Sequence, residues 1–280
     1  MPEGDTIYRT AQTLQRALSG SLVTRFESVF PALNRIDEDR PVAGRMVESV
    51  SARGKHLLMA FSGDLILRTH MRMQGSWHIY RPGERWQRPA RDMRILIQTT
   101  DFVAVGFNVP IAEWLTGRDL GRHRELSALG PDLLAPTFDT ADALQRMRSH
   151  GNDAIADALL NQRIVAGIGN AFKSEILFIA GVDPFQPVGA LSDDDLMRIL
   201  SESRKQLRSS VLDRSQTLSP VSGRRTTRSL DPRARLWVYG RGGKPCRTCG
   251  TPIRARKTGL DARLTYWCPR CQPSRSGGSM

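Results

Sequence analysis

Four cysteines near the C-terminal end form the sharpest chemical pattern in this sequence. Two residues separate Cys246 from Cys249, 18 residues follow, and Cys268 and Cys271 repeat the two-residue spacing. Each pair offers two thiolates from one turn, and four thiolates complete the tetrahedral coordination that zinc prefers. Four protein ligands leave no position open for water, so we predict one structural zinc ion per chain. The intervening residues, GTPIRARKTGLDARLTYW, resemble a basic β-hairpin suited to a nucleic-acid groove.

The first residues, MPEGDT, offer a second kind of chemistry. Removal of Met1 would expose the secondary amine of Pro2, and an α-amino group has a pKa of about 8 against about 10.4 for lysine. An uncharged amine attacks carbonyl-type carbons and forms a Schiff base. Glu3 could then move protons, and a nearby cation such as Lys55 would keep the amine unprotonated. The alternative is that all three are ordinary polar residues at the start of a helix and on the surface.

A third group lies in LLNQRIVAGIGNAFKSEILFIAG, residues 159–181. The pattern predicts a helix ending near Arg163, a glycine-bearing turn, and a second helix that starts at Asn170 and ends before Gly181. Lys173 then lies in the first turn, where a cation opposes the helix dipole unless an anion is bound. The turn amides, Asn170 and Lys173 would together bind a phosphate. A plain helical hairpin is the alternative.

Taken together, these motifs resemble the formamidopyrimidine-DNA glycosylase/endonuclease VIII family of base-excision repair enzymes. The likeness runs from Pro2 to Gln272 and follows the order of the family's motifs: an N-terminal PEG, a GK in a sandwich, a GIGN in a helix–two-turn–helix segment, and a zinc finger. Members of this family are bifunctional DNA glycosylases and abasic-site lyases that act on damaged double-stranded DNA. The resemblance implies that activity here.

The resemblance also implies roles for individual residues. Pro2 would attack C1′ of the damaged nucleotide, and Glu3 would donate a proton to the opening sugar. Lys55 would contact the phosphate near the lesion and donate a proton in β-elimination. Arg263 would bind backbone phosphate and assist δ-elimination, and Asn170 would bind phosphate. Base removal and β,δ-elimination would leave a one-nucleotide gap.

Such an enzyme must flip its target nucleotide and fill the vacancy in the stack. The segment THMRMQGSW occupies the position of the family's wedge loop, which makes Arg72, Met73 and Gln74 candidates. Met73 is the best apolar plug, although a buried strand methionine is the alternative.

The opening PEGDT is like the endonuclease VIII branch, whereas the sister branch typically reads PELPE. The region VAVGFNVPIAEW also lacks a DPRRFG-type loop. We therefore expect oxidised pyrimidines as substrates. Two alternatives remain: a sister-branch glycosylase for oxidised purines, and a non-catalytic zinc-ribbon DNA-binding protein. Ala128 stands where some relatives have a DNA-contacting arginine.

The composition agrees with a polyanionic partner. The 280 residues carry 41 Lys and Arg against 28 Asp and Glu, a formal charge of +13. Such a surplus favours nucleic acid, because basic side chains displace the counterions condensed on phosphates. No apolar run approaches the roughly 18 residues of a membrane span, and no secretory signal is evident. We expect a cytoplasmic, nucleoid-associated monomer. The five histidines show no metal or triad spacing and are interpreted as structural or surface residues.

These residues need elements that hold them. Ile7, Ala11, Leu14 and Leu18 share one face of a helix over residues 4–18, which Gly20 ends. Short β-rich segments from about Ser21 to Phe107 predict an antiparallel sandwich or barrel. Helical patterning resumes from about Asp139 to Leu212, with Asn152 capping a helix through Gln162 and Ser192 one through Leu207.

We therefore predict an α+β multidomain protein with an N-terminal β-sandwich and a leading helix, a helix–two-turn–helix domain, and a C-terminal β-hairpin zinc finger. The expected boundaries follow the composition. They are a catalytic domain over 2–128, the helical DNA-binding domain over 129–214, a basic loop or linker over 215–234, the finger over 235–272, and a disordered tail over 273–280.

Overall fold

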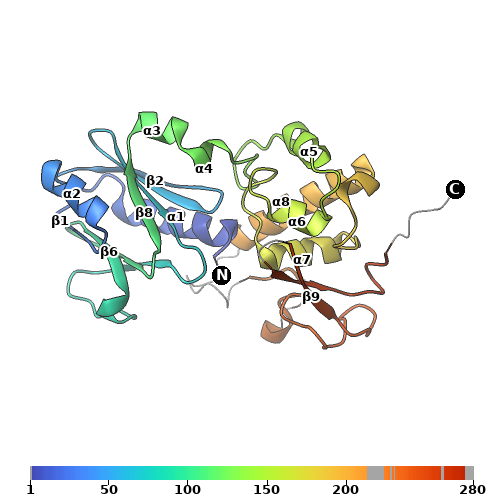
Figure 1. Cartoon of the computed structure of the whole chain (residues 1–280). Helices are drawn as coiled ribbons and strands as arrows, with labels where there is room; N and C mark the ends of the chain where they lie inside the picture. The colour runs from blue at the N-terminus through green and yellow to red at the C-terminus, as the bar shows by residue number, and fades with distance from the viewer. Residues whose placement is uncertain (1, 213–223, 228, 230, 260–261, 275–280) are drawn as a thin grey trace. The chain divides into compact units, whose positions relative to one another are not determined.

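The computed structural model describes residues 2–212, 224–227, 229, 231–259 and 262–274 (Figure 1). Contacts divide the chain into two compact units, Met1–Ala128 and Leu129–Met280. The segment predicted as a linker lies outside the described residues from 215 to 223, and so does the predicted tail from 275 onward. None of the helices in the described part of the chain has both the length and the apolar character needed to cross a membrane.

The first unit is built on two four-stranded antiparallel sheets, which confirms the predicted sandwich. One sheet has the order β1-β6-β7-β5, with β1 Arg25–Ser28, β6 Met93–Gln98, β7 Val103–Phe107 and β5 Ser76–Tyr80. The other has the order β2-β3-β4-β8, with β2 Val47–Arg53, β3 His56–Phe61, β4 Leu65–His70 and β8 Ile111–Leu115. Leu57, Met59 and Phe61 alternate along β3 into a core that also holds Ile95 and Ile97 from the facing sheet.

Helix α1, Gly4–Leu18, is the predicted leading helix. Its apolar residues Ile7, Ala11, Leu14 and Leu18 belong to the sandwich core, because spacings of three and four place them on one face. The helix packs on β2 (Figure 1).

Three helices of this unit were not predicted. They are α2 Pro31–Asp39, α3 Gly117–Arg122 and α4 Arg124–Ser127. Leu33 is the single buried residue of α2, so this helix lacks an apolar period that would distinguish it from the surrounding strands.

The described residues of the second unit form four helices longer than one turn, α5 Thr140–Arg148, α6 Ile155–Leu160, α7 Asn170–Ile179 and α8 Asp193–Leu212. Ser192 caps α8 as predicted, since its Oγ accepts from the Asp195 amide at 3.1 Å, but the helix continues beyond Leu207. The prediction that Asn152 caps a helix through Gln162 is wrong, because Ala154 forms a β-bridge with Pro187 and delays the start of α6.

The predicted basic hairpin is present between the cysteine pairs. Strand β9, Arg254–Thr258, pairs antiparallel with β10, Arg263–Trp267. Short 3-10 turns complete the described fold at η1 Ala90–Asp92, η2 Val188–Ala190 and η3 Pro232–Ala234.

Candidate active site and nucleic-acid interface

Pro2 and Glu3, the first described residues, pack into the fold. Pro2 and Glu3 are buried, and Glu3 is the N-cap residue of α1. The Glu3 carbonyl accepts from the amides of Thr6 at 3.0 Å and Ile7 at 3.1 Å. The nitrogen of Pro2 therefore lies beside the positive end of a 15-residue helix, which disfavours a protonated amine there.

Helix α1 runs antiparallel to β2, so each end of the helix can be located from the direction of the strand. Near the end of the helix, Gln15 Oε1 accepts from the Val50 amide at 2.5 Å, and the Gly20 amide donates to the Val47 carbonyl. The helix and the strand are both about 20 Å long. The start of the helix therefore lies toward the end of β2, where the turn through Gly54 and Lys55 leads into β3.

A second turn lies at the same end of the sandwich. His56, the first residue of β3, pairs with His70, the last residue of β4. The chain then turns through residues 71–75 into β5, and this turn and Lys55 define what we call the Lys55 end of the sandwich. The turn is tight, since a Cβ on Gly75 would lie 2.7 Å from the Met71 carbonyl oxygen.

The three wedge candidates, Arg72, Met73 and Gln74, are exposed at this turn. Arg72 has a φ of 44°, and its amide donates to His70 Nδ1 at 3.1 Å. Met73 is 55% exposed and belongs to no strand, which argues against the reading as a core methionine. An exposed apolar residue at a turn tip is suited to insertion between bases.

An ionic cluster surrounds His56, the residue that follows Lys55. Arg68 is 3% exposed, and its guanidinium contacts the carboxylates of Glu113 and Glu125 and, at 2.9 Å, His56 Nδ1. His123 joins through Glu113 Oε1 at 2.9 Å. Burial first, and then the Arg68 charge, lowers the pKa of His56 to about 2. This cluster was missed because its members are brought together by strand register rather than by sequence spacing.

His70 is similarly kept neutral. Burial, then Arg68 and then Lys55, lowers its pKa to about 4. Because Nδ1 accepts the Arg72 amide, the proton of the neutral ring is on Nε2. The sequence interpretation of the histidines as structural residues therefore describes His56 well. It missed the link from His70 to the turn through residues 71–75, which we call the wedge turn because it carries the wedge candidates.

In the second unit, helix α7 uses its polar residues to hold the finger hairpin. Asn170 Nδ2 donates to the Leu264 carbonyl at 2.9 Å, and the Tyr266 amide donates to Ser174 Oγ at 3.3 Å. Asn170 is 7% exposed, and its Oδ1 is buried without a hydrogen-bond partner among the described residues. Arg263, half-buried, begins the strand that these contacts hold.

Lys173 is placed differently from the expectation that it binds phosphate. It is 0% exposed, and its Nζ donates to Thr265 Oγ1 at 2.8 Å, which in turn lies 2.7 Å from Thr258 Oγ1. Burial raises the pKa of Asp157, and the nearby Lys173 charge offsets part of that rise. In this structure the ammonium is an internal group between helix and hairpin.

Glu175 holds the first residues of the predicted finger and part of the predicted linker before it. Its buried carboxylate accepts from three consecutive amides, those of Trp237, Val238 and Tyr239, at 2.7–2.8 Å, and also from the Thr226 hydroxyl. Part of the predicted linker is thus held against α7, because an ionised carboxylate makes strong bonds to backbone amides.

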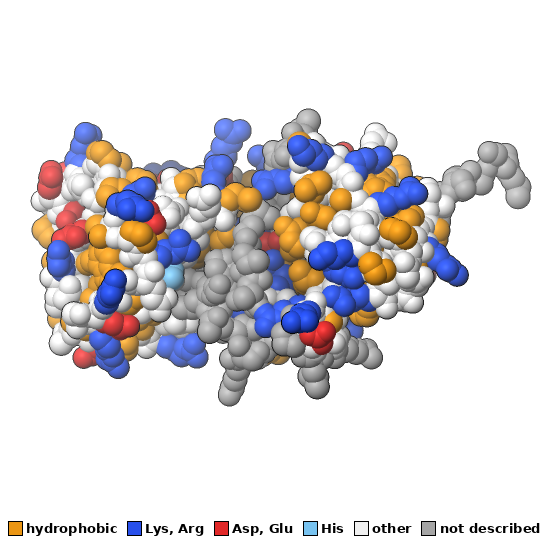
Figure 2. Space-filling view, turned by 90° about the horizontal axis from the view of Figure 1, so that it is seen from below, with side chains coloured by type: hydrophobic (Ala, Val, Ile, Leu, Met, Phe, Trp, Pro, Cys, Tyr) orange, Lys and Arg blue, Asp and Glu red, His pale blue; other side chains and the backbone are white. Residues whose placement is uncertain are grey.

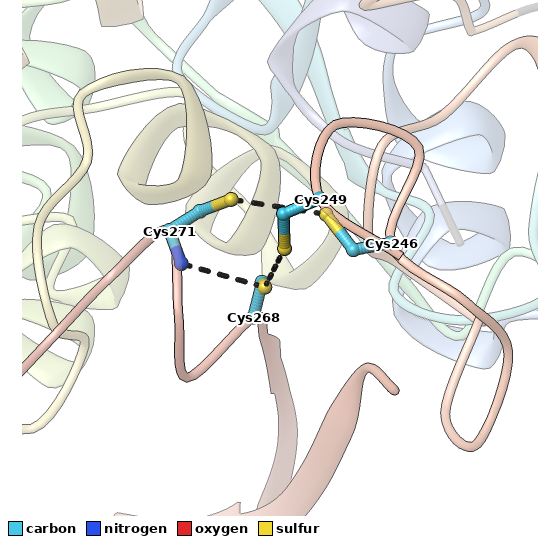
Figure 3. A group of neighbouring side chains, drawn as sticks. All are labelled: Cys246, Cys249, Cys268 and Cys271. Carbon is cyan, nitrogen blue, oxygen red and sulfur yellow. Dashed lines mark hydrogen bonds between the residues drawn. The ribbon is translucent and has the colours of Figure 1, made fainter. Parts of the chain in front are cut away.

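The four cysteines converge on one point (Figure 3). Their sulfur atoms all lie within 4.8 Å of one another, with Cys246 Sγ 3.9 Å from Cys271 Sγ and Cys249 Sγ 3.4 Å from Cys268 Sγ. A tetrahedral zinc with bonds of about 2.3 Å requires sulfur separations of about 3.8 Å. Hydrogen bonding from Thr251 lowers the pKa of Cys249 to about 6, whereas burial raises the pKa of Cys268 and of Cys271, so the fit to zinc rests on the sulfur geometry. The residues therefore fit zinc.

The finger core surrounds these ligands. Phe178 from α7 packs with Val238, Ile253 and the cysteines. Its ring also stacks on that of Trp237, with the ring centroids 5.5 Å apart. The small apolar cluster draws on a helix outside the finger, so a metal at the cysteines would stabilise both elements.

Three family models match the chain in order. They are the formamidopyrimidine-DNA glycosylase N-terminal domain over residues 1–110, the formamidopyrimidine-DNA glycosylase H2TH domain over 129–220, and the zinc finger found in FPG and IleRS over 243–273.

Curated relatives match over nearly full length. A probable endonuclease 8 2 of Streptomyces coelicolor is 42% identical, covering 99% of this chain and 97% of the relative. The DNA-(apurinic or apyrimidinic site) lyase Nei2 of Mycolicibacterium smegmatis is 38% identical, with 97% and 99% covered. Endonuclease 8 of Escherichia coli is 33% identical, with 97% and 100% covered.

Among solved structures, Lactococcus lactis Fpg in complex with DNA containing an abasic site superposes with a TM-score of 0.82. That match covers 98% of this chain and 100% of the other at 21% identity. At this identity the match shows the shared fold.

Proposed function

From the premise that the chain belongs to the formamidopyrimidine-DNA glycosylase/endonuclease VIII family, in its endonuclease VIII branch, we propose that Pro2 is its nucleophile and oxidised pyrimidines are its substrates. The chain is a DNA glycosylase and abasic-site lyase of base-excision repair. The nucleophile, the residues that assist it and the lesion class are the content of the proposal.

In this mechanism the Pro2 nitrogen attacks C1′ of the flipped nucleotide. The bond from C1′ to the base breaks, the base leaves with the proton that the Pro2 amine gives up, and Glu3 donates a second proton to the ring oxygen as the sugar opens. The product is an iminium between Pro2 and C1′. Loss of a C2′ proton then expels the 3′ phosphate, and a second elimination, assisted by Arg263, expels the 5′ phosphate.

The observation that carries the proposal is the position of Pro2 at the Lys55 end of the sandwich. The nitrogen precedes the N-cap of α1, and that end of the helix lies toward the turn that bears Lys55. Burial of Pro2 and its place at the positive end of the helix both favour a neutral amine at neutral pH. A protein that only binds DNA needs none of these arrangements.

DNA contacts would come from both units. At the Lys55 end, Lys55 would contact phosphate and Met73, flanked by Arg72 and Gln74, would fill the vacated stack. In the second unit, Asn170 and Arg263 would bind backbone phosphates, with the hairpin held in place by structural zinc at Cys246, Cys249, Cys268 and Cys271. Zinc supplies folding free energy there and takes no part in the reaction. We propose that the enzyme acts on duplex DNA as a monomer.

Oxidised pyrimidines are favoured over oxidised purines by the opening PEGDT and by the segment VAVGFNVPIAEW, which forms β7, β8 and their connection. The endonuclease 8 names of the relatives point to the same branch. Oxidised purines remain the second candidate, since the mechanism would be the same and only the base pocket would differ.

Borohydride trapping on duplex DNA tests the nucleophile. The protein with Met1 removed should form a covalent adduct with DNA that contains an abasic site or thymine glycol. A version with residues retained before Pro2 should bind the same DNA but form no adduct, because an acylated nitrogen cannot form an iminium. Binding without trapping by the processed protein would contradict the mechanism. Strong preference for 8-oxoguanine opposite cytosine would instead move the substrate to purines.

A further inference from the structure

The connection between β5 and β6, residues 81–92, is a basic loop with no role in the reaction above. It reads RPGERWQRPARD, with Arg81, Arg85, Arg88 and Arg91 against Glu84 and Asp92. Figure 2 shows that Lys and Arg side chains outnumber acidic ones on the face of the molecule seen there. The path of this loop across the sheet determines where its arginines lie.

The loop has a fixed shape. Two hydrogen bonds close its first turn. The Glu84 amide donates to the Arg81 carbonyl at 3.0 Å, and the Arg81 amide donates to Glu84 Oε2 at 2.8 Å. In its middle, the Gln87 amide donates to Tyr80 Oη at 3.1 Å, and the Trp86 ring lies 5.6 Å from Phe107. Glu84 is therefore engaged with backbone, and the loop presents its arginines without needing to be ordered first.

The loop crosses the outer face of its sheet toward the Lys55 end. It starts at the opposite end, where Arg81 Nη1 donates to the Asp101 carbonyl at 3.3 Å in the turn between β6 and β7. The loop ends at Met93, which pairs with Phe107 across β6 and β7. Phe107 also pairs with Ser76, the residue directly after the wedge turn, so Met93 lies at the Lys55 end. Met93 and Ser76 are two strand spacings apart, about 10 Å. Arg91, two residues before Met93, therefore lies at the Lys55 end.

Two of these arginines are available to a partner. Arg85 and Arg91 are exposed, and neither forms an ion pair with a carboxylate of the described residues. Arg88 is half-buried, and its charge adds to burial in lowering the pKa of His78. Like charges on one short loop repel one another, and a polyanion that neutralises them relieves this repulsion.

We propose that the 81–92 loop is an additional phosphate-binding surface, on which Arg91 and Arg85 contact the duplex backbone beyond the wedge turn. The proposal rests on the proposed function, because it assumes that the lesion binds at the Lys55 end. It predicts a footprint that extends about 10 Å from the wedge turn, or about three base pairs at 3.4 Å each.

The test compares Arg85→Gln/Arg91→Gln with Arg16→Gln/Arg118→Gln. Both pairs remove two exposed positive charges from the same unit. Arg16 is near the end of α1, and Arg118 follows Gly117, whose amide donates to Asp64 Oδ1 in the turn between β3 and β4. Both control positions thus lie at the end opposite to Lys55. Binding is measured on a long duplex that contains a tetrahydrofuran abasic analogue, across a range of salt concentrations.

The loop variant should bind roughly 10-fold more weakly, and the slope of log K against log salt should fall by about 0.9 for each lost phosphate contact, or about 1.8 for two. The control variant should bind like the wild type. Trimming the duplex to fewer than three base pairs on one side of the lesion should remove the difference between loop variant and wild type. Borohydride trapping at saturating abasic DNA should remain unchanged in the loop variant.

Equal affinities and slopes for wild type and loop variant would overturn the proposal. An equal loss in both variants would also overturn it, because the effect would then be one of net charge. These outcomes are separate from failure of the proposed function, which would show as a wild-type protein that binds the duplex but is never trapped.

Discussion

Arg68 Nη2 lies 2.9 Å from His56 Nδ1, and this contact determines the protonation of the residue that follows Lys55. A guanidinium is always a donor, so Nδ1 must accept and the ring proton must be on Nε2. His56 in turn lies edge-on to His70, with ring centroids 4.8 Å apart, and His70 accepts the Arg72 amide. One buried cation thus supports both turns of the Lys55 end.

Replacement of Arg68 by methionine should lower the free energy of unfolding by about 2–4 kcal/mol, because it leaves the His56 acceptor and two carboxylates without their common donor. Urea denaturation measures the change. Arg25→Met is the matched control, since Arg25 pairs with Glu27 on an exposed strand and should cost no more than about 1 kcal/mol. Similar losses in the two variants would show that the cluster is not specially important.

Acid should weaken the fold through His56. Its pKa in the folded state, about 2, is below the unfolded value of 6.5, so its contribution is fully present above pH 6.5 and declines as the pH falls toward 2. Between pH 6.5 and pH 5 the loss should reach about 1.6 kcal/mol. His56→Asn keeps an acceptor near the Nδ1 position without the titration, so its urea midpoint should change less over this range. A wild-type midpoint independent of pH would count against a buried neutral imidazole.

Removal of zinc should unfold the finger. We expect one zinc per chain by metal analysis, and chelation should expose Trp237, which stacks on Phe178, and shift tryptophan emission to longer wavelength. DNA affinity should fall with the emission change and return when zinc is added back. Cys268→Ser should behave like the chelated protein. Intact emission and DNA binding in a metal-free sample would exclude a structural role for zinc.

Lys173→Met distinguishes an internal lysine from a phosphate ligand. Loss of the bond to Thr265 should destabilise the second unit by about 1.5–3 kcal/mol and weaken DNA binding by displacing the hairpin. The salt dependence of binding should stay the same, whereas loss of a phosphate contact would lower the slope by about 0.9. Thr265→Val removes the other partner and should reproduce the binding defect, again without a change in slope.

Glu3→Gln should separate base removal from strand cleavage. Excision of thymine glycol should slow by about 10²–10⁴-fold, the usual contribution of a general acid. Trapping on a preformed abasic site should persist, because that sugar opens to an aldehyde without help from the protein. Glu48→Gln, on the exposed side of β2, controls for the loss of a carboxylate. Equal loss of both activities would place Glu3 in the lyase steps as well.

Local pattern was sufficient for the elements that carry the chemistry. Helix α1 follows from its apolar spacing, and the hairpin and zinc ligands follow from the two cysteine pairs. Each of these features is encoded within a few residues of sequence, so it could be predicted without knowing the rest of the fold.

Features that depend on long-range register could not be predicted in this way. Arg68 meets Glu113 because β4 pairs with β8, and Lys173 turns inward because Thr265 in β10 offers a hydroxyl. Helix α2 was missed because it buries only Leu33. In each case the decisive neighbour is far away in sequence, or the local signal is too short.

The bonds of Glu175 to residues 237–239 limit how this protein could be recombined with its relatives. A chimaera that takes the finger from another member but keeps this α7 would have to reproduce the three amides that the carboxylate holds, together with the Leu264 carbonyl and Thr265 hydroxyl that meet Asn170 and Lys173. Exchanges are therefore expected to succeed when the crossover lies at Ala128–Leu129, so that helix and finger are inherited together.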